Sequence, residues 1–187
     1  MLSYADLKKG VQIIIEGEPY EVLEARPLKM AQRRAVIQTK IRNLITGNVF
    51  SRNFQQGETF EEAEISKTEV KFLYTHREKY VFCYLGNSLK RFELKAEEIG
   101  EQRKFLKPNQ IVEALIFKDK VINVSLPIKV HLRVVEAPPA LRTGRAEAGT
   151  KQITLETGTK ISAPMFIKDG NVIEVNTETG EYVRRIE

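Results

Sequence analysis

Short stretches in which apolar and polar residues alternate recur along most of the chain, and this pattern constrains the fold more than any other feature. A period of two places successive side chains on opposite faces of an extended strand. We predict strands at residues 11–17, 18–25, 35–44, 48–54, 69–75, 79–85, 111–118, 120–126, 129–137, 151–157, 171–176 and 181–186. The best helical candidate is short, residues 94–100, and ends at Gly100. Many short strands separated by polar turns are typical of small barrels or sandwiches.

Two joints divide this series of strands. An acidic run over residues 61–64 ends the first group, and Pro127 ends a strand near the second joint, because proline cannot continue a central ladder. We therefore predict three domains, residues 1–64, 65–127 and 128–187. Units of about 60 residues are close to the lower size limit for independent folding. The chain has no long linker, so we expect a fairly rigid string of small all-β domains.

The composition is that of a folded protein, with 42% hydrophobic and 29% charged residues. No apolar stretch approaches the roughly 18 to 20 residues needed to cross a bilayer, and the start, MLSYADLKKG, lacks the apolar region of a secretory signal. The single cysteine, Cys83, cannot form an internal disulfide, and its apolar neighbours predict a buried thiol. We expect a cytoplasmic protein without membrane contact.

Residues for catalysis or metal binding are sparse. His76 and His131 are far apart and lack a Cys, His or Asp at ligand spacing, so each is interpreted as a surface or strand histidine. Aspartate occurs singly, at Asp6, Asp119 and Asp169, which does not indicate a metal-binding cluster or a catalytic pair. We predict no catalytic residue, metal or cofactor, and an enzyme acting on an acidic substrate is the weakest hypothesis.

Positive charge is concentrated in the N-terminal third. The net charge is +5 and the pI about 9.2, which is compatible with a polyanionic partner. Residues 25–57 contain no Asp or Glu. The bases of the same window are Arg26, Lys29, Arg33, Arg34, Lys40, Arg42 and Arg52.

The strand at residues 35–44 predicts how some of these bases are presented. Ile37, Thr39 and Ile41 are expected to face a core. Gln38, Lys40, Arg42 and Arg34 are expected to share the outer face, with successive side chains about 6 to 7 Å apart. Such a row could follow an RNA backbone, or it could be a solvated edge whose bases discourage aggregation. The missing acids favour the first reading, and the scarcity of exposed aromatics predicts contact through backbone and shape.

Several ordered stretches resemble bacterial elongation factor P over essentially the whole chain. They include DLKKG, EGEPYEVLEA, TKIRNLITGNV, FQQGETFEEAEI, LYTHREKYVF, LPIKVHLRVVEAPP and GTKQITLETGTKISAPMFIKDGNVIEVNTETGEYVRR. The resemblance implies an SH3-like, KOW-type barrel followed by two OB-fold barrels, in an elongated, tRNA-like shape. It also implies a monomer that binds the 70S ribosome between the P and E sites. There it would promote peptide-bond formation at stalled polyproline sequences by positioning the P-site peptidyl-tRNA.

The segment PLKMAQRRAV, residues 27–36 and here called the tip segment, aligns with the hairpin tip of this family. In relatives the tip approaches the CCA end of the tRNA, and its central base is often modified enzymatically. Counting back from Thr39-Lys40 puts Gln32 at that position, and glutamine cannot accept the known modifications. The resemblance therefore implies an unmodified tip in which Lys29, Gln32, Arg33 and Arg34 make the contacts. It also implies that Lys40 and Arg42 contact the tRNA backbone. If the alignment slips by one residue, Arg33 becomes the tip base and modification returns.

The third domain departs from the family in a second place. The loop that carries Gly-Asp-Thr in relatives aligns with Gly144-Arg145-Ala146, so a contact with mRNA at the E site would be made to phosphate. Tyr182 and Arg185 match the family's Tyr-Val-x-Arg and are candidates for ribosome contact, although Tyr182 could equally pack within the barrel. The alternative to an elongation factor is a paralogue, or a generic RNA-binding β-barrel protein, with an altered role.

Overall fold

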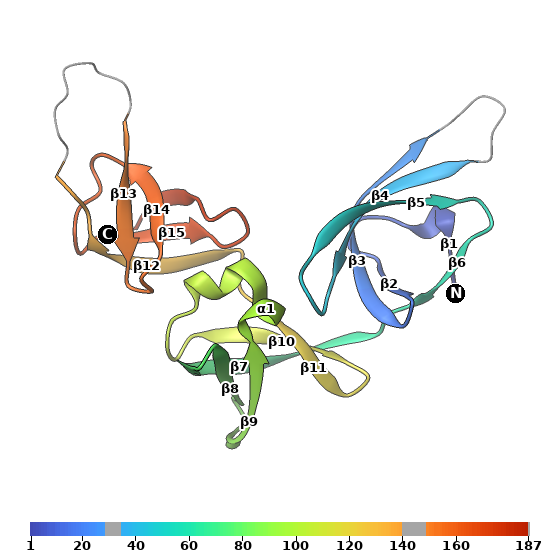
Figure 1. Ribbon diagram of the computed structural model, residues 1–187, viewed down its shortest axis with the longest axis horizontal. Coiled ribbons are helices and arrows are strands. Elements are labelled where there is room, and N and C mark those ends of the chain that lie inside the picture. The colour runs from blue at the N-terminus through green and yellow to red at the C-terminus, as the bar shows by residue number, and fades with distance from the viewer. Residues whose placement is uncertain (29–34, 140–148, 187) are drawn as a thin grey trace. The chain divides into compact units, whose positions relative to one another are not determined.

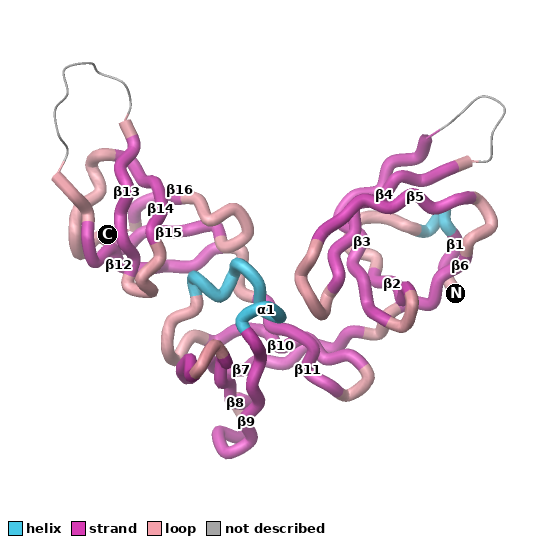
Figure 2. The backbone as a smooth tube through the Cα atoms, viewed as in Figure 1, coloured by secondary structure: helices cyan, strands magenta, loops and turns pink. Residues whose placement is uncertain are grey.

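The computed structural model describes residues 1–28, 35–139 and 149–186, in which antiparallel strands form three sheets (Figures 1 and 2). The expected all-β class, with three small β-sheet domains, is confirmed. By contacts the chain divides into two compact units. One consists of Met1–Glu69, Glu93–Gly100 and Glu113–Ser125, and the other of Val70–Phe92, Glu101–Val112 and Leu126–Glu187. Since the middle sheet contributes to both units, the limits predicted at residues 64 and 127 stay predictions.

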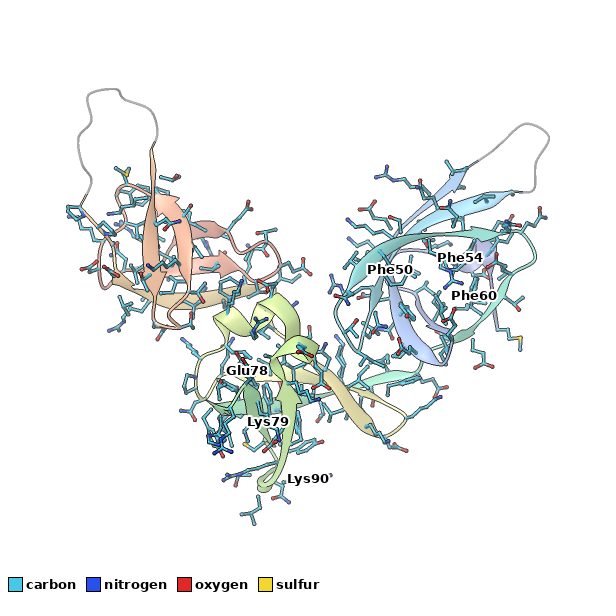
Figure 3. The ribbon with its side chains drawn as sticks, in the orientation of Figure 1. Phe50, Phe54, Phe60, Glu78, Lys79 and Lys90 are labelled. Carbon is cyan, nitrogen blue, oxygen red and sulfur yellow. The ribbon has the colours of Figure 1, made fainter. Side chains whose placement is uncertain are left out.

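The first sheet has six strands in the order β1-β6-β2-β3-β4-β5. The strands are β1 (Leu2–Ser3), β2 (Gln12–Ile15), β3 (Glu18–Leu28), β4 (Val36–Asn43), β5 (Val49–Gln55) and β6 (Thr59–Glu62), with a 3-10 helix at Tyr4–Asp6. Glu16 and Gly17 both have positive φ and form the predicted tight turn between β2 and β3. Inside the barrel the rings of Phe54 and Phe60 pack edge to face, with their centroids 4.7 Å apart (Figure 3). The core residues are Leu7, Ile13, Ile15, Val22, Ile37, Ile41, Phe54 and Phe60.

The middle sheet has five strands in the order β11-β10-β7-β8-β9. They are β7 (Ile65–His76), β8 (Lys79–Tyr84), β9 (Asn87–Lys95), β10 (Ile111–Phe117) and β11 (Lys120–Ser125). Between β9 and β10 lie α1 (Ala96–Ile99) and a 3-10 helix at Gly100–Phe105. Gly100 caps α1 with a φ of 72°, as the sequence predicts, and Cys83 is buried with 3% of its surface exposed. Figure 3 labels Glu78 and Lys79, at the turn between β7 and β8 and the start of β8, and Lys90, on β9.

The third sheet also has five strands, in the order β14-β13-β12-β15-β16. They are β12 (Lys129–Glu136), β13 (Thr150–Leu155), β14 (Lys160–Pro164), β15 (Val172–Asn176) and β16 (Tyr182–Arg185). Its core includes aliphatic side chains that are at most 1% exposed, among them Leu132, Ile153, Leu155, Ile167 and Ile173. Buried and exposed residues alternate along β12 from Lys129 to Val134, which gives this strand one apolar and one polar face.

Four strands were not predicted, β1, β6, β9 and β14. β9 has seven exposed residues among its nine, so its sequence carries little alternation that could be recognised. β1 and β6 are short, and they pair with each other through Leu2 and Phe60, which are far apart in the chain. No helix in the part of the chain that the structure describes is long and apolar enough to cross a membrane.

Candidate nucleic-acid interface

The hairpin of β3 and β4 carries the tip segment. After a register shift between Val22 and Glu24, the two strands pair as far as Leu28 with Val36, so this long antiparallel ladder extends into both ends of the tip segment. Four of its residues to which the resemblance assigns a role, Lys29, Gln32, Arg33 and Arg34, lie outside the described residues. Their contacts therefore stay a prediction, and the described part of the interface begins at the base of the hairpin.

The inner face of β4 matches the predicted alternation. Ile37, Thr39 and Ile41 are exposed by 6%, 1% and 0%, which confirms that they face the core. Thr39 is a polar residue in this apolar environment, and its hydroxyl donates a hydrogen bond of 2.7 Å to the carbonyl oxygen of Arg52. Because the buried hydroxyl is satisfied in this way, it does not destabilise the core. Because these residues pack inward, the residues between them on β4 face outward.

The outer face of β4 is more mixed in charge than its own sequence indicates. Gln38 and Lys40 are exposed and Arg42 is half-buried. However, the register of β3 puts Glu24 opposite Lys40 and Glu21 opposite Arg42. Residues opposite each other in an antiparallel pair share a face of the sheet, so an acid-free stretch of sequence does not form an acid-free surface here. This corrects the argument that missing acids favour an RNA contact.

Neighbouring side chains further define this face. Arg26 lies opposite Gln38 and forms an ion pair with Glu24, with the two charged groups 3.3 Å apart. On the other side β5 contributes Ser51 opposite Lys40 and Asn53 opposite Gln38. Both are exposed and uncharged. Lys40 thus stands between an acid and a hydroxyl, in a row that can donate hydrogen bonds to phosphate but whose positive charge is partly compensated.

Arg52, the seventh base of the acid-free stretch, does not belong to this row. It pairs with Thr39, which places it on the opposite face of the sheet from Lys40. Its guanidinium lies 5.5 Å from the centroid of the Phe54 ring and 3.9 Å from Glu16 (Figure 3 labels Phe54). This contact with the buried Phe54 ring gives Arg52 a packing role.

In the third domain, the structure describes only part of the predicted site. Gly144, Arg145 and Ala146 lie outside the described residues. Tyr182 is half-buried on β16, opposite Val175. Arg185 is exposed, and its guanidinium lies 5.9 Å from the centroid of the Phe166 ring, which is itself 56% exposed. Both readings of Tyr182, packing within the domain and contact with the ribosome, stay open.

The cluster of charged side chains around Glu174 was not predicted from the sequence. Glu174 lies on β15 with 5% of its side chain exposed, and Lys129, His131 and Arg184 surround it. Arg184 has the largest effect in lowering the pKa of the Glu174 carboxyl to about 2; burial opposes it, and Lys129 and His131 add to it. His131 is a strand histidine, as expected, but its partner is 43 residues away in the chain. Only the alternation of KVHLR in β12 could have indicated a charged face here. Within residues 1–28, 35–139 and 149–186, no three His, Cys, Asp or Glu side chains form a group that could hold a metal ion.

Comparison with known proteins agrees with the order of the three sheets. Residues 3–60 match the elongation factor P KOW-like domain, residues 65–124 the elongation factor P OB domain, and residues 130–185 the elongation factor P C-terminal domain. An archaeal structure, eukaryotic translation initiation factor 5A from Methanococcus jannaschii, has a TM-score of 0.50 at 17% identity. The match covers 67% of this chain and 90% of that one, and it supports the fold alone.

The fold and these matches define a translation factor built from a KOW-like barrel followed by OB-type barrels. Among curated relatives, elongation factor P of Thermodesulfovibrio yellowstonii is 36% identical over 100% of this chain and 99% of its own length. Elongation factor P of Thermotoga maritima is 40% identical over 99% of this chain and its full length. The chain therefore belongs to the elongation factor P family.

Proposed function

We propose that this protein binds the ribosome between the P and E sites and promotes peptide-bond formation at stalled polyproline sequences. The observation that carries the proposal is the match to elongation factor P through three consecutive domains, over the full length of relatives 36 to 40% identical. The partners are the 70S ribosome, the P-site peptidyl-tRNA and, at the E site, mRNA. The protein acts as a monomer.

The proposed mechanism is positional. The tip segment reaches the CCA end of the peptidyl-tRNA, and Lys40 and Arg42 contact the tRNA backbone from the outer face of β4. Holding the peptidyl-tRNA in a reactive geometry lowers the barrier by reducing the entropy lost on reaching the transition state, without covalent chemistry by the factor. The long β3–β4 ladder supports this reading, because its pairing extends into the tip segment as far as Leu28 and Val36.

The activity test removes the two adjacent arginines of the tip segment. In Arg33→Ala/Arg34→Ala, we expect rescue of a polyproline reporter to fall at least about tenfold in cells that lack the native protein, since two charge-assisted contacts are lost. Lys8→Ala/Lys9→Ala is the matched control, because it removes two adjacent exposed charges from the same domain. Full rescue by the tip variant would refute the proposed role of the tip segment.

The tip is proposed to work unmodified, with Gln32 at the position that relatives modify. Intact-mass measurement of the protein from its native host, followed by peptide mapping, tests this directly. We expect the mass calculated from the sequence over the peptide containing residues 29–34. An added mass on Arg33 would instead support the alignment shifted by one residue.

Two further contacts are proposed in the third domain. Gly144-Arg145-Ala146 approaches the E-site codon, where arginine in place of the acid of relatives favours a phosphate partner. Tyr182 and Arg185 contact the ribosome, and the exposure of Arg185 next to the exposed Phe166 ring is compatible with this role.

The second candidate function is that of a paralogue with an altered role. It is favoured by Gln32 at a position where relatives carry a base. The polyproline reporter separates the two, because unimpaired translation through prolines after deletion of this protein would point to the paralogue.

A further inference from the structure

Asn123, a polar residue on β11, is buried with 6% of its surface exposed, and its neighbour Val124 is buried as well. Successive residues of a strand point to opposite faces, so both faces of β11 are covered at this point. The Nδ2 atom of Asn123 donates hydrogen bonds to the carbonyl oxygens of Glu98, at 2.7 Å, and of Ile45, at 3.2 Å. Its Oδ1 atom accepts one from the backbone amide of Val124 at 2.7 Å, so both polar atoms of the buried amide have partners.

The two carbonyl partners lie in different parts of the chain. Glu98 belongs to α1, which packs beside β11 (Figure 1), and the last carbonyl oxygens of a helix have no partner within it. The bond to Glu98 is therefore explained by the folding of the middle sheet. The bond to Ile45 is not, because Ile45 lies in the turn that joins β4 to β5 of the first sheet. Ile45, Glu98 and Asn123 all belong to the same compact unit.

The β4–β5 turn is also held from the side of the first sheet. Asn43 is 5% exposed, and its Oδ1 atom accepts hydrogen bonds from the backbone amides of Ile45 and Thr46, at 2.8 and 2.9 Å. Its Nδ2 atom donates a hydrogen bond of 2.6 Å to Oε2 of Glu18, the first residue of β3. Two buried asparagines, Asn43 and Asn123, thus connect the β3–β4 hairpin to α1 and β11.

The turn and the tip segment lie at opposite ends of β4. The strand runs from Val36, in the tip segment, to Asn43, beside the turn. Seven steps of about 3.3 Å separate the two residues, so their distance along the strand is about 23 Å. At that distance, a rotation of about 5° at the turn displaces Val36 by about 2 Å. Such a displacement is large for a positional mechanism, since a misplacement of about 1 Å can cost about a hundredfold in rate.

We propose that Asn123 is a positioning residue, which fixes the direction of the β3–β4 hairpin through the carbonyl group of Ile45 and thereby determines where the tip segment is held. The effect on activity rests on the proposed function, in which the tip segment reaches the peptidyl-tRNA. A hydrogen bond constrains the direction of its partner as well as the distance. An apolar contact is non-directional, so an apolar residue of the same size would not replace the amide.

The test compares Asn123→Leu, which keeps the size of the side chain but removes the donor, with Thr39→Val. Thr39→Val is the matched control, because it removes a buried side-chain hydrogen bond from β4 and leaves the contacts of Asn123 and Asn43 in place. Residual dipolar couplings of backbone amides are measured in the full chain, for the first sheet and for α1 with β11. We expect one alignment tensor to fit both sets in the native protein and in Thr39→Val, and Asn123→Leu to require two. One tensor in a folded Asn123→Leu, or two in Thr39→Val, overturns the proposal.

Asn43→Ala tests the same connection if Asn123→Leu does not fold, because it releases the turn from the first sheet and leaves α1 and β11 unaltered. We expect this variant also to require two tensors, and a single tensor would overturn the proposal.

Polyproline rescue is the second readout. We expect it to fall at least about tenfold in Asn123→Leu and to stay at the native level in Thr39→Val, since only the first variant displaces the tip segment. Full rescue by a variant that requires two tensors would refute the positioning role. If the native protein itself gives no rescue, the proposed function fails, whereas the couplings still decide whether Asn123 fixes the hairpin.

Discussion

The outer faces of β4 and β12 present similar rows of donors but differ in how their negative charge is placed. On β4, Lys40 and Arg42 lie opposite Glu24 and Glu21, and the Glu24 side chain is 51% exposed. On β12, the acid opposite His131 is Glu174, which is 5% exposed. An exposed acid cancels the field of a neighbouring base, whereas an acid covered by bases leaves them on the surface. The local sequence of a strand therefore does not determine the charge of its face.

The largest effect on folding stability is expected from truncating one core side chain beneath each row. Ile41 and Leu132 are both 0% exposed, and each lies between two residues of its row. We expect Ile41→Ala and Leu132→Ala each to lower the free energy of unfolding of its own domain by about 2 to 5 kcal/mol, through lost burial and a new cavity. Urea denaturation followed by NMR signals from each domain measures both. If the losses differ greatly, the two rows do not rest on equivalent cores.

A smaller loss of folding stability is expected from Glu174→Gln, and this loss should depend on pH. The folded-state pKa of about 2 lies below the ordinary 4.5, so the carboxylate stabilises the fold above pH 4.5 and this contribution is lost as the pH falls through about 2. We expect the variant to be less stable than the native protein at pH 7, with the difference shrinking between pH 4.5 and 2. Glutamine retains part of the hydrogen bonding, which limits the loss.

Glu24→Gln is the matched control on the first domain. Its side chain is half-exposed in an ion pair with Arg26, so its loss should change stability by less than about 1 kcal/mol. Urea titrations of both variants from pH 7 to pH 2 make the comparison. Equal destabilisation by the two substitutions would contradict the distinction between a covered and an exposed acid.

The smallest effect is expected from removing both acids of the first face. Glu21→Gln/Glu24→Gln should raise the affinity for a tRNA transcript about two- to threefold at low salt, because Lys40 and Arg42 lose their compensating neighbours. The matched control is Glu61→Gln/Glu62→Gln, which removes two charges from β6 of the same domain, where both residues are exposed. A gain of the same size in the control would mean that net charge, and not the register of β3, controls binding.

Much of the fold follows from local pattern. Alternation identified both strands of the hairpin that carries the tip segment and the inward-facing Ile37, Thr39 and Ile41, and the stop signal at Gly100 identified the short helix. These features depend on residues that are neighbours in the chain, so a short stretch of sequence contains the relevant information. β9 was not predicted because most of its side chains are exposed, so its sequence does not alternate. It forms a strand through its pairing with β8.

The sequence by itself determined most of the strands, the inward- and outward-facing residues of β4 and the family, since these follow from periodicity and from ordered motifs. Tertiary structure alone decided which charges meet. Glu24 lies opposite Lys40 because of the register of β3, and Glu174 contacts His131 across 43 residues of chain. Electrostatic energy depends on distance and burial in space, and strand register sets both by pairing residues that are remote in sequence.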